Sequence, residues 1–179
     1  MVGNIMDLEE KEIWVGKPSQ YINFDTFSRC VFIILMSIPL KQVWGRAEFL
    51  QQFHENPTIV LAYKILIGAI IVLPMIWAFF AWLSVYCRSY RLTTQRLSET
   101  YGILSKVTED LELYRVKDTT TLKPFSLRMF GLGNIVLMTS DKSTPVVLME
   151  GMKDVDKLQT IVRKYVEIMR THKGVREID

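Results

Sequence analysis

The sequence predicts a membrane-anchored α+β protein, in which a two-helix transmembrane hairpin precedes a small β-barrel or sandwich capped by a C-terminal amphipathic helix. The run Ile65–Cys87 contains no charged side chain, and a shorter apolar run, Cys30–Leu40, precedes it. From Arg88 onward, apolar residues first alternate with polar ones and later recur at helical spacing. The predicted divisions are an N-terminal segment over 1–26, a hairpin over 27–87 and a β domain over 88–179.

The second apolar segment is long enough to span a bilayer. At a rise of 1.5 Å per residue, Ile65–Cys87 covers roughly 30 Å of hydrocarbon. A helix is expected because a segment inside lipid must satisfy its own backbone hydrogen bonds. The core helix of a soluble protein rarely stays apolar on every face over such a length. We therefore predict a span over about 58–87.

The first apolar segment is shorter than a usual span. Cys30–Leu40 becomes long enough if the helix extends over about 27–44, with Arg29 and Lys41 reaching the two head-group layers. Trp44 would then anchor the interface. A re-entrant or interfacial segment is the alternative for this part of the chain.

Lysine and arginine residues predict the orientation of the hairpin. Arg88, Arg91 and Arg96 follow the second span closely, so the positive-inside rule places both termini in the cytoplasm of a bacterial inner membrane. Lys64, near the other end of the same span, is expected to reach the opposite interface. The acidic N-terminus lacks the basic and apolar regions of a signal peptide.

Alternating residues predict the strands of the β domain. A hairpin is expected with Thr94-Gln95 as its turn and Leu97–Tyr101 as its second strand. A further strand is expected to run from Ile103 through Val107 towards Leu113. The remaining predicted segments are an extended Val116–Leu122, a turn or short helix over Lys123–Phe130, and strands over Asn134–Thr139 and Thr144–Met149.

A helical apolar stripe ends the chain. Its members recur every three or four residues, and Ile161 and Ile168 widen it. The central members are Val155, Leu158, Val162, Tyr165 and Met169. Five to seven short strands followed by one such helix suggest a small open barrel that the helix plugs.

Four motifs in this order resemble the bacterial pleckstrin-homology-like (PH-like) membrane protein family. They are Glu12–Ser19 (EIWVGKPS), Tyr90–Leu97 (YRLTTQRL), the run after Gly102, and Arg128–Ile135 (RMFGLGNI). The resemblance implies a PH-like barrel capped by a C-terminal helix and held against the inner leaflet. It also implies a binding module that tends to form oligomers.

The sequence contains no recognisable catalytic constellation, and we expect a protein that is not an enzyme and has no cofactor or metal. Gly131-Leu-Gly133 lacks a third glycine and precedes a strand, so it does not fit a nucleotide loop; turn glycines are expected there instead. His54 and His172 lie on opposite sides of the predicted membrane. Cys30 and Cys87 have no metal-ligand spacing.

Charge is unevenly distributed along the chain. Residues 1–28 carry two Lys against five acids, a net −3, whereas residues 88–179 carry sixteen Lys and Arg against twelve acids, a net +4. This mild basic excess fits an anionic lipid surface and is too small to indicate nucleic-acid binding.

The basic residues after the second span have two interpretations. Arg88, Arg91 and Arg96 either fix the end of the helix topologically or contact lipid head groups. Eukaryotic PH domains bind phosphoinositides through basic residues clustered across the first hairpin. Only Arg91 and Arg96 flank the Thr94-Gln95 turn here, so phosphoinositide binding is not expected.

The sequence thus favours a non-enzymatic interaction or accessory protein. It would present its PH-like domain at the cytoplasmic leaflet to a protein partner or to another copy of itself. One alternative is an envelope sensor that binds anionic membrane lipids, and another is an accessory subunit of a larger membrane enzyme complex.

Overall fold

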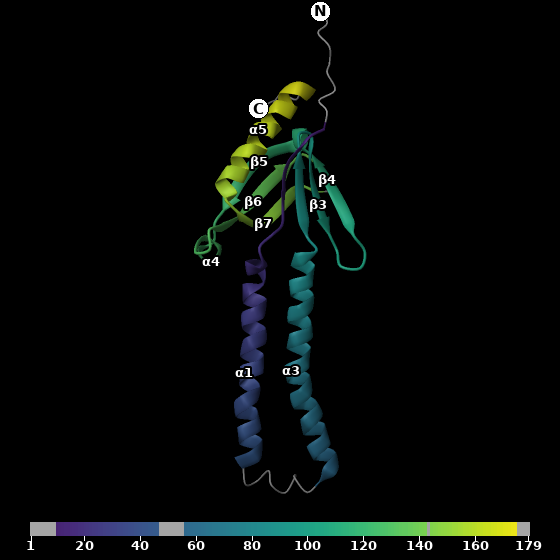
Figure 1. Ribbon diagram of the computed structural model, residues 1–179, viewed down its shortest axis with the longest axis vertical. Coiled ribbons are helices and arrows are strands. Elements are labelled where there is room, and N and C mark those ends of the chain that lie inside the picture. The colour runs from purple at the N-terminus through teal and green to yellow at the C-terminus, as the bar shows by residue number, and fades with distance from the viewer. Residues whose placement is uncertain (1–9, 47–55, 143, 175–179) are drawn as a thin grey trace, which may run out of the picture. The chain divides into compact units, whose positions relative to one another are not determined.

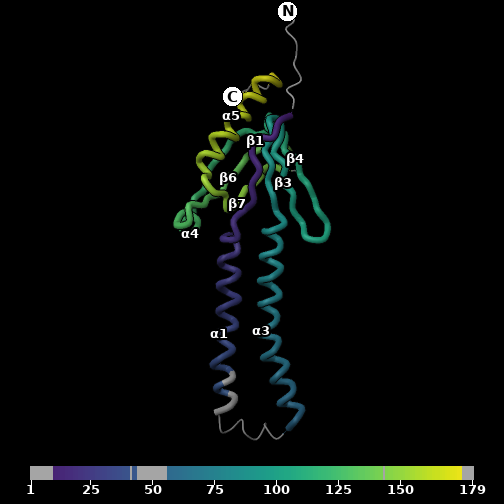
Figure 2. Tube along the Cα trace, viewed as in Figure 1, coloured from purple at the N-terminus to yellow at the C-terminus, as the bar shows by residue number. Residues whose placement is uncertain are grey.

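A computed structural model describes residues 10–46, 56–142 and 144–174, with the side chains of 41 and 44–46 excepted. The chain divides into two compact units. One unit combines residues 1–22 with 84–179, and we call it the β domain. The other comprises residues 23–83, and we call it the helical hairpin. Figure 2 traces the chain through both units.

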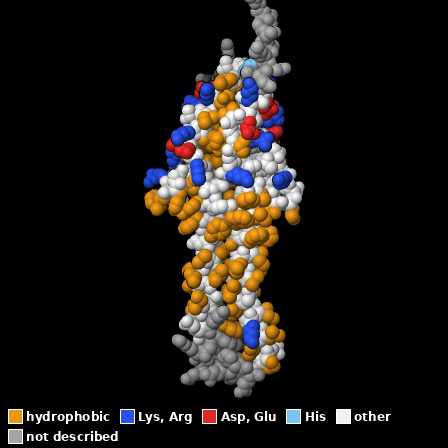
Figure 3. Space-filling view, in the orientation of Figure 1, with side chains coloured by type: hydrophobic (Ala, Val, Ile, Leu, Met, Phe, Trp, Pro, Cys, Tyr) orange, Lys and Arg blue, Asp and Glu red, His pale blue; other side chains and the backbone are white. Residues whose placement is uncertain are grey.

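The helical hairpin contains two long helices, α1 (Phe24–Arg46) and α3 (Pro57–Tyr86). The stretches Gln20–Leu40 and Pro57–Tyr86 are long and apolar enough to cross a membrane, with mean hydropathies of 1.3 and 2.5. Only 17% and 6% of their most apolar windows are buried, unlike the core helix of a soluble protein. Hydrophobic side chains cover both helices, whereas most charged side chains lie on the β domain (Figure 3).

A hydrogen bond joins the two helices, and each helix contains a proline. The Asn23 amide nitrogen donates a hydrogen bond to the Ala81 carbonyl oxygen at 2.8 Å, which joins the start of α1 to α3. Pro39 lies inside α1 and Pro74 inside α3, so both helices continue through the prolines. The loop with His54 lies outside the described residues.

A four-stranded antiparallel sheet forms the first layer of the β domain, in the order β1-β2-β3-β4 (Figure 1). The strands are β1 (Glu12–Gly16), β2 (Ser89–Thr93), β3 (Arg96–Tyr101) and β4 (Val107–Glu112). β1 precedes the helices in sequence, and its neighbour β2 follows them. The helical hairpin is therefore an insertion between the first two strands of one sheet. The sequence predicts a separate N-terminal segment over 1–26, and its local pattern does not indicate this strand.

The predicted turn at Thr94-Gln95 is confirmed. The Thr93 hydroxyl accepts hydrogen bonds from the backbone N–H groups of Arg96 and Gln95, at 3.0 and 3.3 Å. The next predicted strand is wrong over Ile103–Lys106, because a loop occupies these residues and β4 begins at Val107. Gly102 has a φ of +110°, a backbone conformation open to glycine, which turns the chain away from the strand direction.

A three-stranded antiparallel sheet, in the order β5-β6-β7, forms the second layer. Its elements, with the helices that precede or interrupt it, are η2 (Leu113–Arg115), β5 (Val116–Leu122), α4 (Phe125–Arg128), β6 (Leu132–Thr139) and β7 (Val146–Lys153). The strands and short helix predicted here are present. The predicted barrel is not confirmed, since the described strands form two separate hydrogen-bonded sheets.

Helix α5 (Val155–Lys173) covers the core between the sheets (Figure 1). Its buried residues are Val155, Leu158, Val162, Val166 and Met169. The helix is confirmed, but its apolar stripe is narrower than predicted, because Ile168 is 42% exposed. The buried residues of α5 pack with buried residues of both sheets, among them Leu92, Leu97, Ile135 and Leu137.

The glycines before β6 have different roles. Gly131 adopts a φ of +67° in the turn after α4, as expected for a turn glycine. Gly133 lies inside β6, where a Cβ atom would approach the Val155 Cγ1 to 2.8 Å. The second glycine therefore permits close packing of the strand against α5.

Candidate functional site

Arg88 links the two sheets of the β domain. It lies between the end of α3 and the start of β2. Its Nε lies 3.6 Å from an oxygen of Glu99 on β3, and its Nη1 lies 3.4 Å from an oxygen of Glu150 on β7. The three side chains are only 18–34% exposed, so these ion pairs are partly shielded from water.

Burial shifts the ionisation of two groups beside Arg88. The pKa of Glu99 is raised above 4.5, mainly because burial disfavours the carboxylate, while the charge of Arg88 opposes the shift. Burial and the nearby Glu99 raise the pKa of Tyr90 to about 12. The Tyr90 hydroxyl donates a hydrogen bond to the Leu148 carbonyl oxygen at 3.4 Å, a second link between the sheets.

We expect Arg88→Gln to lower the stability of the β domain by about 1 kcal/mol near pH 7, because it leaves two partly buried carboxylates without their partner. A raised folded-state pKa means that the folded protein binds the proton more tightly than the unfolded chain, so stability falls as pH rises above 4.5. Without Arg88 the pKa of Glu99 rises further. The variant should therefore lose less stability near pH 4 than near pH 7.

Pulse proteolysis in urea, applied to the full chain in nanodiscs, measures this difference. Arg91→Gln is the control, because its ion pair with Glu12 is 63% and 56% exposed and should contribute little. An equal loss for Arg88→Gln at both pH values would contradict the assigned electrostatic role.

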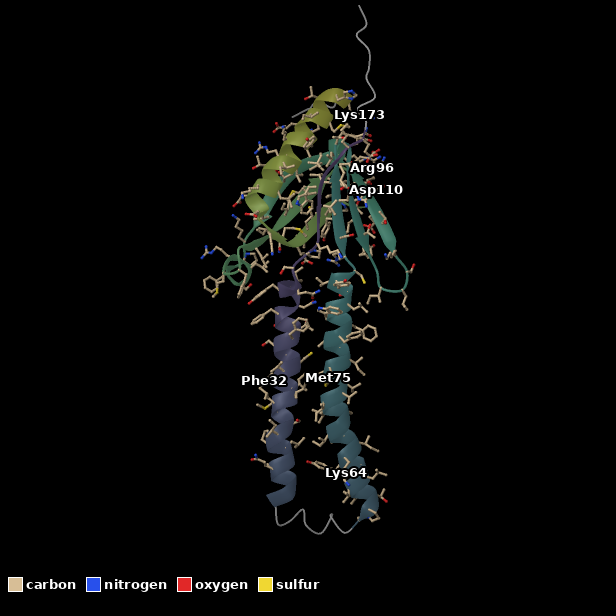
Figure 4. The ribbon with its side chains drawn as sticks, in the orientation of Figure 1. Phe32, Lys64, Met75, Arg96, Asp110 and Lys173 are labelled. Carbon is tan, nitrogen blue, oxygen red and sulfur yellow. The ribbon has the colours of Figure 1, made fainter. Side chains whose placement is uncertain are left out.

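Arg91 and Arg96 lie on the outer face of the four-stranded sheet. Arg91 pairs with Glu12 of β1 at 3.3 Å. Arg96 pairs with Glu10 at 3.0 Å and with Asp110 of β4 at 3.2 Å; Figure 4 shows Arg96 and Asp110 on neighbouring strands. These side chains line a shallow hollow of about 590 Å³. Residues with aliphatic hydroxyl groups also line it, namely Ser89, Thr93, Ser98, Thr100 and Thr108.

The three arginines predicted for lipid contact are thus distributed over different surfaces. Arg88 lies between the sheets, whereas Arg91 and Arg96 share the outer face, and each has a carboxylate partner. A lipid phosphate would have to compete with these carboxylates. The pairing of Arg88 with Glu99 can be predicted from the sequence. A hairpin with its turn at Thr94-Gln95 places Glu99 opposite Tyr90, and Arg88 lies two residues before Tyr90 on the same face. Nothing local to Arg91 or Arg96 indicated the acidic residues before the first helix.

The predicted interface anchors belong to the helices. Arg29 pairs with Asp25 on the exposed surface of α1. Lys64 is exposed on α3, 22 positions before Tyr86, the last residue of that helix, which is roughly 33 Å of helix. Lys41 and Trp44 lie within α1, but their side chains are outside the described part of the structure. The roles of all four at an interface remain predictions.

The cysteines and histidines of the described residues form no metal site. No group of three or more His, Cys, Asp or Glu residues there could hold a metal ion. Cys30 and Cys87 are free thiols. His172 lies in the last turn of α5.

Two antiparallel sheets of four and three strands, capped by a C-terminal helix, define a PH-like domain into which a pair of apolar helices is inserted. The chain belongs to the bacterial PH domain family, because that family model matches residues 32–166, more than half of the chain. The matched residues begin within α1, so they include most of the helical hairpin and do not include β1. The sequence resemblance is thereby confirmed.

Searches among curated proteins and among solved structures found no match. Family membership supports a protein or lipid interaction module as the general class of function.

Proposed function

We propose that this protein is a non-enzymatic interaction or accessory protein, anchored in the bacterial inner membrane with both termini in the cytoplasm. The observation that carries the proposal is the insertion of two apolar helices between β1 and β2. Only Cys87 and Arg88 separate α3 from β2, so the start of β2 lies within about 10 Å of the end of that helix. A spanning α3 would hold the PH-like domain at the membrane surface.

The outer edge of β4 is the surface we propose for a protein partner or a second copy of the chain. In the described residues β4 pairs with β3 alone, and Thr108, Glu109 and Asp110 are exposed. An open edge offers unpaired backbone groups to an incoming strand. The opposite sheet is less accessible at β5, because the Gln159 side chain donates a hydrogen bond to the Thr119 carbonyl oxygen.

Cysteine labelling in spheroplasts tests the anchoring. With Cys30→Ala and Cys87→Ser as background, we expect His54→Cys to react with a membrane-impermeant maleimide from outside. Lys157→Cys, on the exposed face of α5, should react only after permeabilisation. The protein should also stay in the membrane pellet after carbonate extraction. The reverse labelling pattern, or extraction by carbonate, would refute the proposed topology.

A separate photo-crosslinking experiment tests the proposed partner surface at β4. A photo-crosslinking amino acid at Thr108 should give a discrete adduct, identified by mass spectrometry as a second copy or a partner protein. Glu109→Lys, which reverses an exposed charge on the same edge, should reduce that adduct. Lys157 is the control crosslinking position. Equal adducts at both positions would contradict an interaction at β4.

Recognition of anionic lipids by Arg88, Arg91 and Arg96 is the alternative function. It predicts salt-sensitive binding of the domain to anionic liposomes, lost in Arg91→Ala or Arg96→Ala. The ion pairs of all three arginines favour the protein-interaction hypothesis. A role as accessory subunit of a membrane enzyme would appear as co-purification with catalytic partners in mild detergent.

A further inference from the structure

Two loops of the PH-like domain expose large apolar side chains. The turn between β3 and β4, residues 102–106, carries Leu104, which is fully exposed. The connection between β5 and β6, residues 123–131, contains α4 and carries Phe125 and Met129, which are 70% and 67% exposed. Hydrophobic side chains gather over both loops in Figure 3. Exposed aromatic and aliphatic groups clustered at loop tips mark an interaction surface.

The β3–β4 loop lies at the end of the sheet where the chain arrives from α3. Ser89, the first residue of β2, pairs with Thr100 near the end of β3, and Thr100 pairs with Thr108 near the start of β4. The loop from 102 to 106 therefore leaves the sheet at the same end at which residues 87 and 88 enter it.

The α4 loop lies beside the segment that leads into α1. The rings of Tyr21 and Phe130 are 3.6 Å apart between their centroids. The Ser19 backbone N–H donates a hydrogen bond to the Gly151 carbonyl oxygen at 3.1 Å, so this segment is held against β7. Within the β domain, both loops thus belong to the end at which the chain leaves for the helices and returns from them (Figure 1).

The charges of the loops favour a lipid surface. Neither loop contains Asp or Glu, and their charged residues are Lys106, Arg128 and Lys123, of which Lys123 pairs with Asp156 of α5. The Arg128 guanidinium lies 5.8 Å from the centre of the Phe125 ring, so a cation lies directly beside the exposed aromatic group. Apolar tips flanked by basic residues match an interface in which acyl chains lie beneath anionic head groups.

We propose that the tips of both loops insert into the head-group layer of the membrane that holds α1 and α3. This inference rests on the proposed function, because a spanning α3 brings β2 and the neighbouring loop ends to the bilayer. The three most exposed apolar residues of the two loops, Leu104, Phe125 and Met129, enter the boundary between head groups and acyl chains. Two loop contacts in addition to the helices then fix the orientation of the domain on the leaflet.

Spin-label accessibility in nanodiscs tests the inference. Leu104→Cys and Met129→Cys are labelled separately in the full chain with Cys30→Ala and Cys87→Ser, in phosphatidylcholine mixed with phosphatidylglycerol. Lys157→Cys, on an exposed face of α5, is the matched control. We expect the ratio of collisions with oxygen to collisions with a water-soluble nickel chelate to be several-fold higher at 104 and 129 than at 157.

Each outcome separates the loop inference from the anchoring on which it rests. Labels at 104 and 129 that are as accessible to the nickel chelate as the label at 157, in protein that resists carbonate extraction, would overturn the loop inference alone. Extraction by carbonate would overturn the anchoring and the inference with it. Low accessibility to both reagents, with spin–spin broadening between copies, would assign the loops to a protein contact instead. Protected β6 amides in hydrogen exchange confirm that each labelled variant is folded.

Discussion

A soluble protein made by joining residues 10–22 to residues 88–174 through a glycine-serine linker is expected to fold, although it lacks the whole helical hairpin. Residues 88–174 alone are expected to be less stable by about 3 kcal/mol and to aggregate. The reason is that the first strand of the four-stranded sheet lies before the helices.

Loss of β1 removes both packing and backbone pairing. Ile13 and Trp14 are half-buried and pack against the core, and burial of such side chains supplies most of the expected difference. Without β1, the backbone of β2 becomes an open edge beside exposed core residues, which favours aggregation.

Urea denaturation of the two soluble proteins, followed by circular dichroism, measures the difference. Within the joined protein, Trp14→Ala should lower stability by about 2 kcal/mol. Val15→Ser, at the 51% exposed neighbouring position, should be nearly neutral. Equal stability of the fragments with and without β1 would show that the insertion topology is wrong.

Val162→Asp is expected to unfold the PH-like domain. Val162 is completely buried on α5 within the core cluster. An aspartate there would bury a carboxyl group among apolar side chains, at a cost of at least about 4 kcal/mol. This is a large fraction of the stability of a small domain.

Ile168→Asp on the same helix is the matched control. Both residues belong to the stripe that periodicity predicts, but Ile168 is 42% exposed, so its replacement should cost less than about 1 kcal/mol. Hydrogen exchange of the β6 amides in the full chain distinguishes the two variants. Similar losses of protection would contradict the placement of α5.

Local patterns were sufficient where an element depends on its own residues. The β2–β3 hairpin, the strands β5 to β7 and helix α5 follow from alternation, a tight turn and helical spacing. The predicted apolar stripe on α5 is too wide, because it includes Ile168, which is 42% exposed. Periodicity shows that this residue lies on the apolar side of the helix, but it does not show how far the sheets extend beneath the helix. The alternation of apolar and polar residues through Ile103 and Val107 likewise predicts a strand directly after Gly102, although the backbone turns at that glycine.

Only part of the candidate site can be predicted from the sequence. Arg88, Arg91 and Arg96 were identified by their place after an apolar run, but their carboxylate partners come from other strands and from the segment before the helices. Because ion-pair partners are selected by proximity in the folded chain, a cluster of basic residues in the sequence does not reveal whether its charge is available to a ligand.

The amino-acid sequence was enough to establish two apolar helices, a following β domain, its terminal helix and the family resemblance, because each depends on composition or short-range periodicity. The pairing of β1 with β2 across the inserted helices, the separation into two sheets and the neutralisation of the arginines depend on contacts between residues far apart in the chain. Such contacts form when the folded backbone brings these residues together, and no local pattern records them.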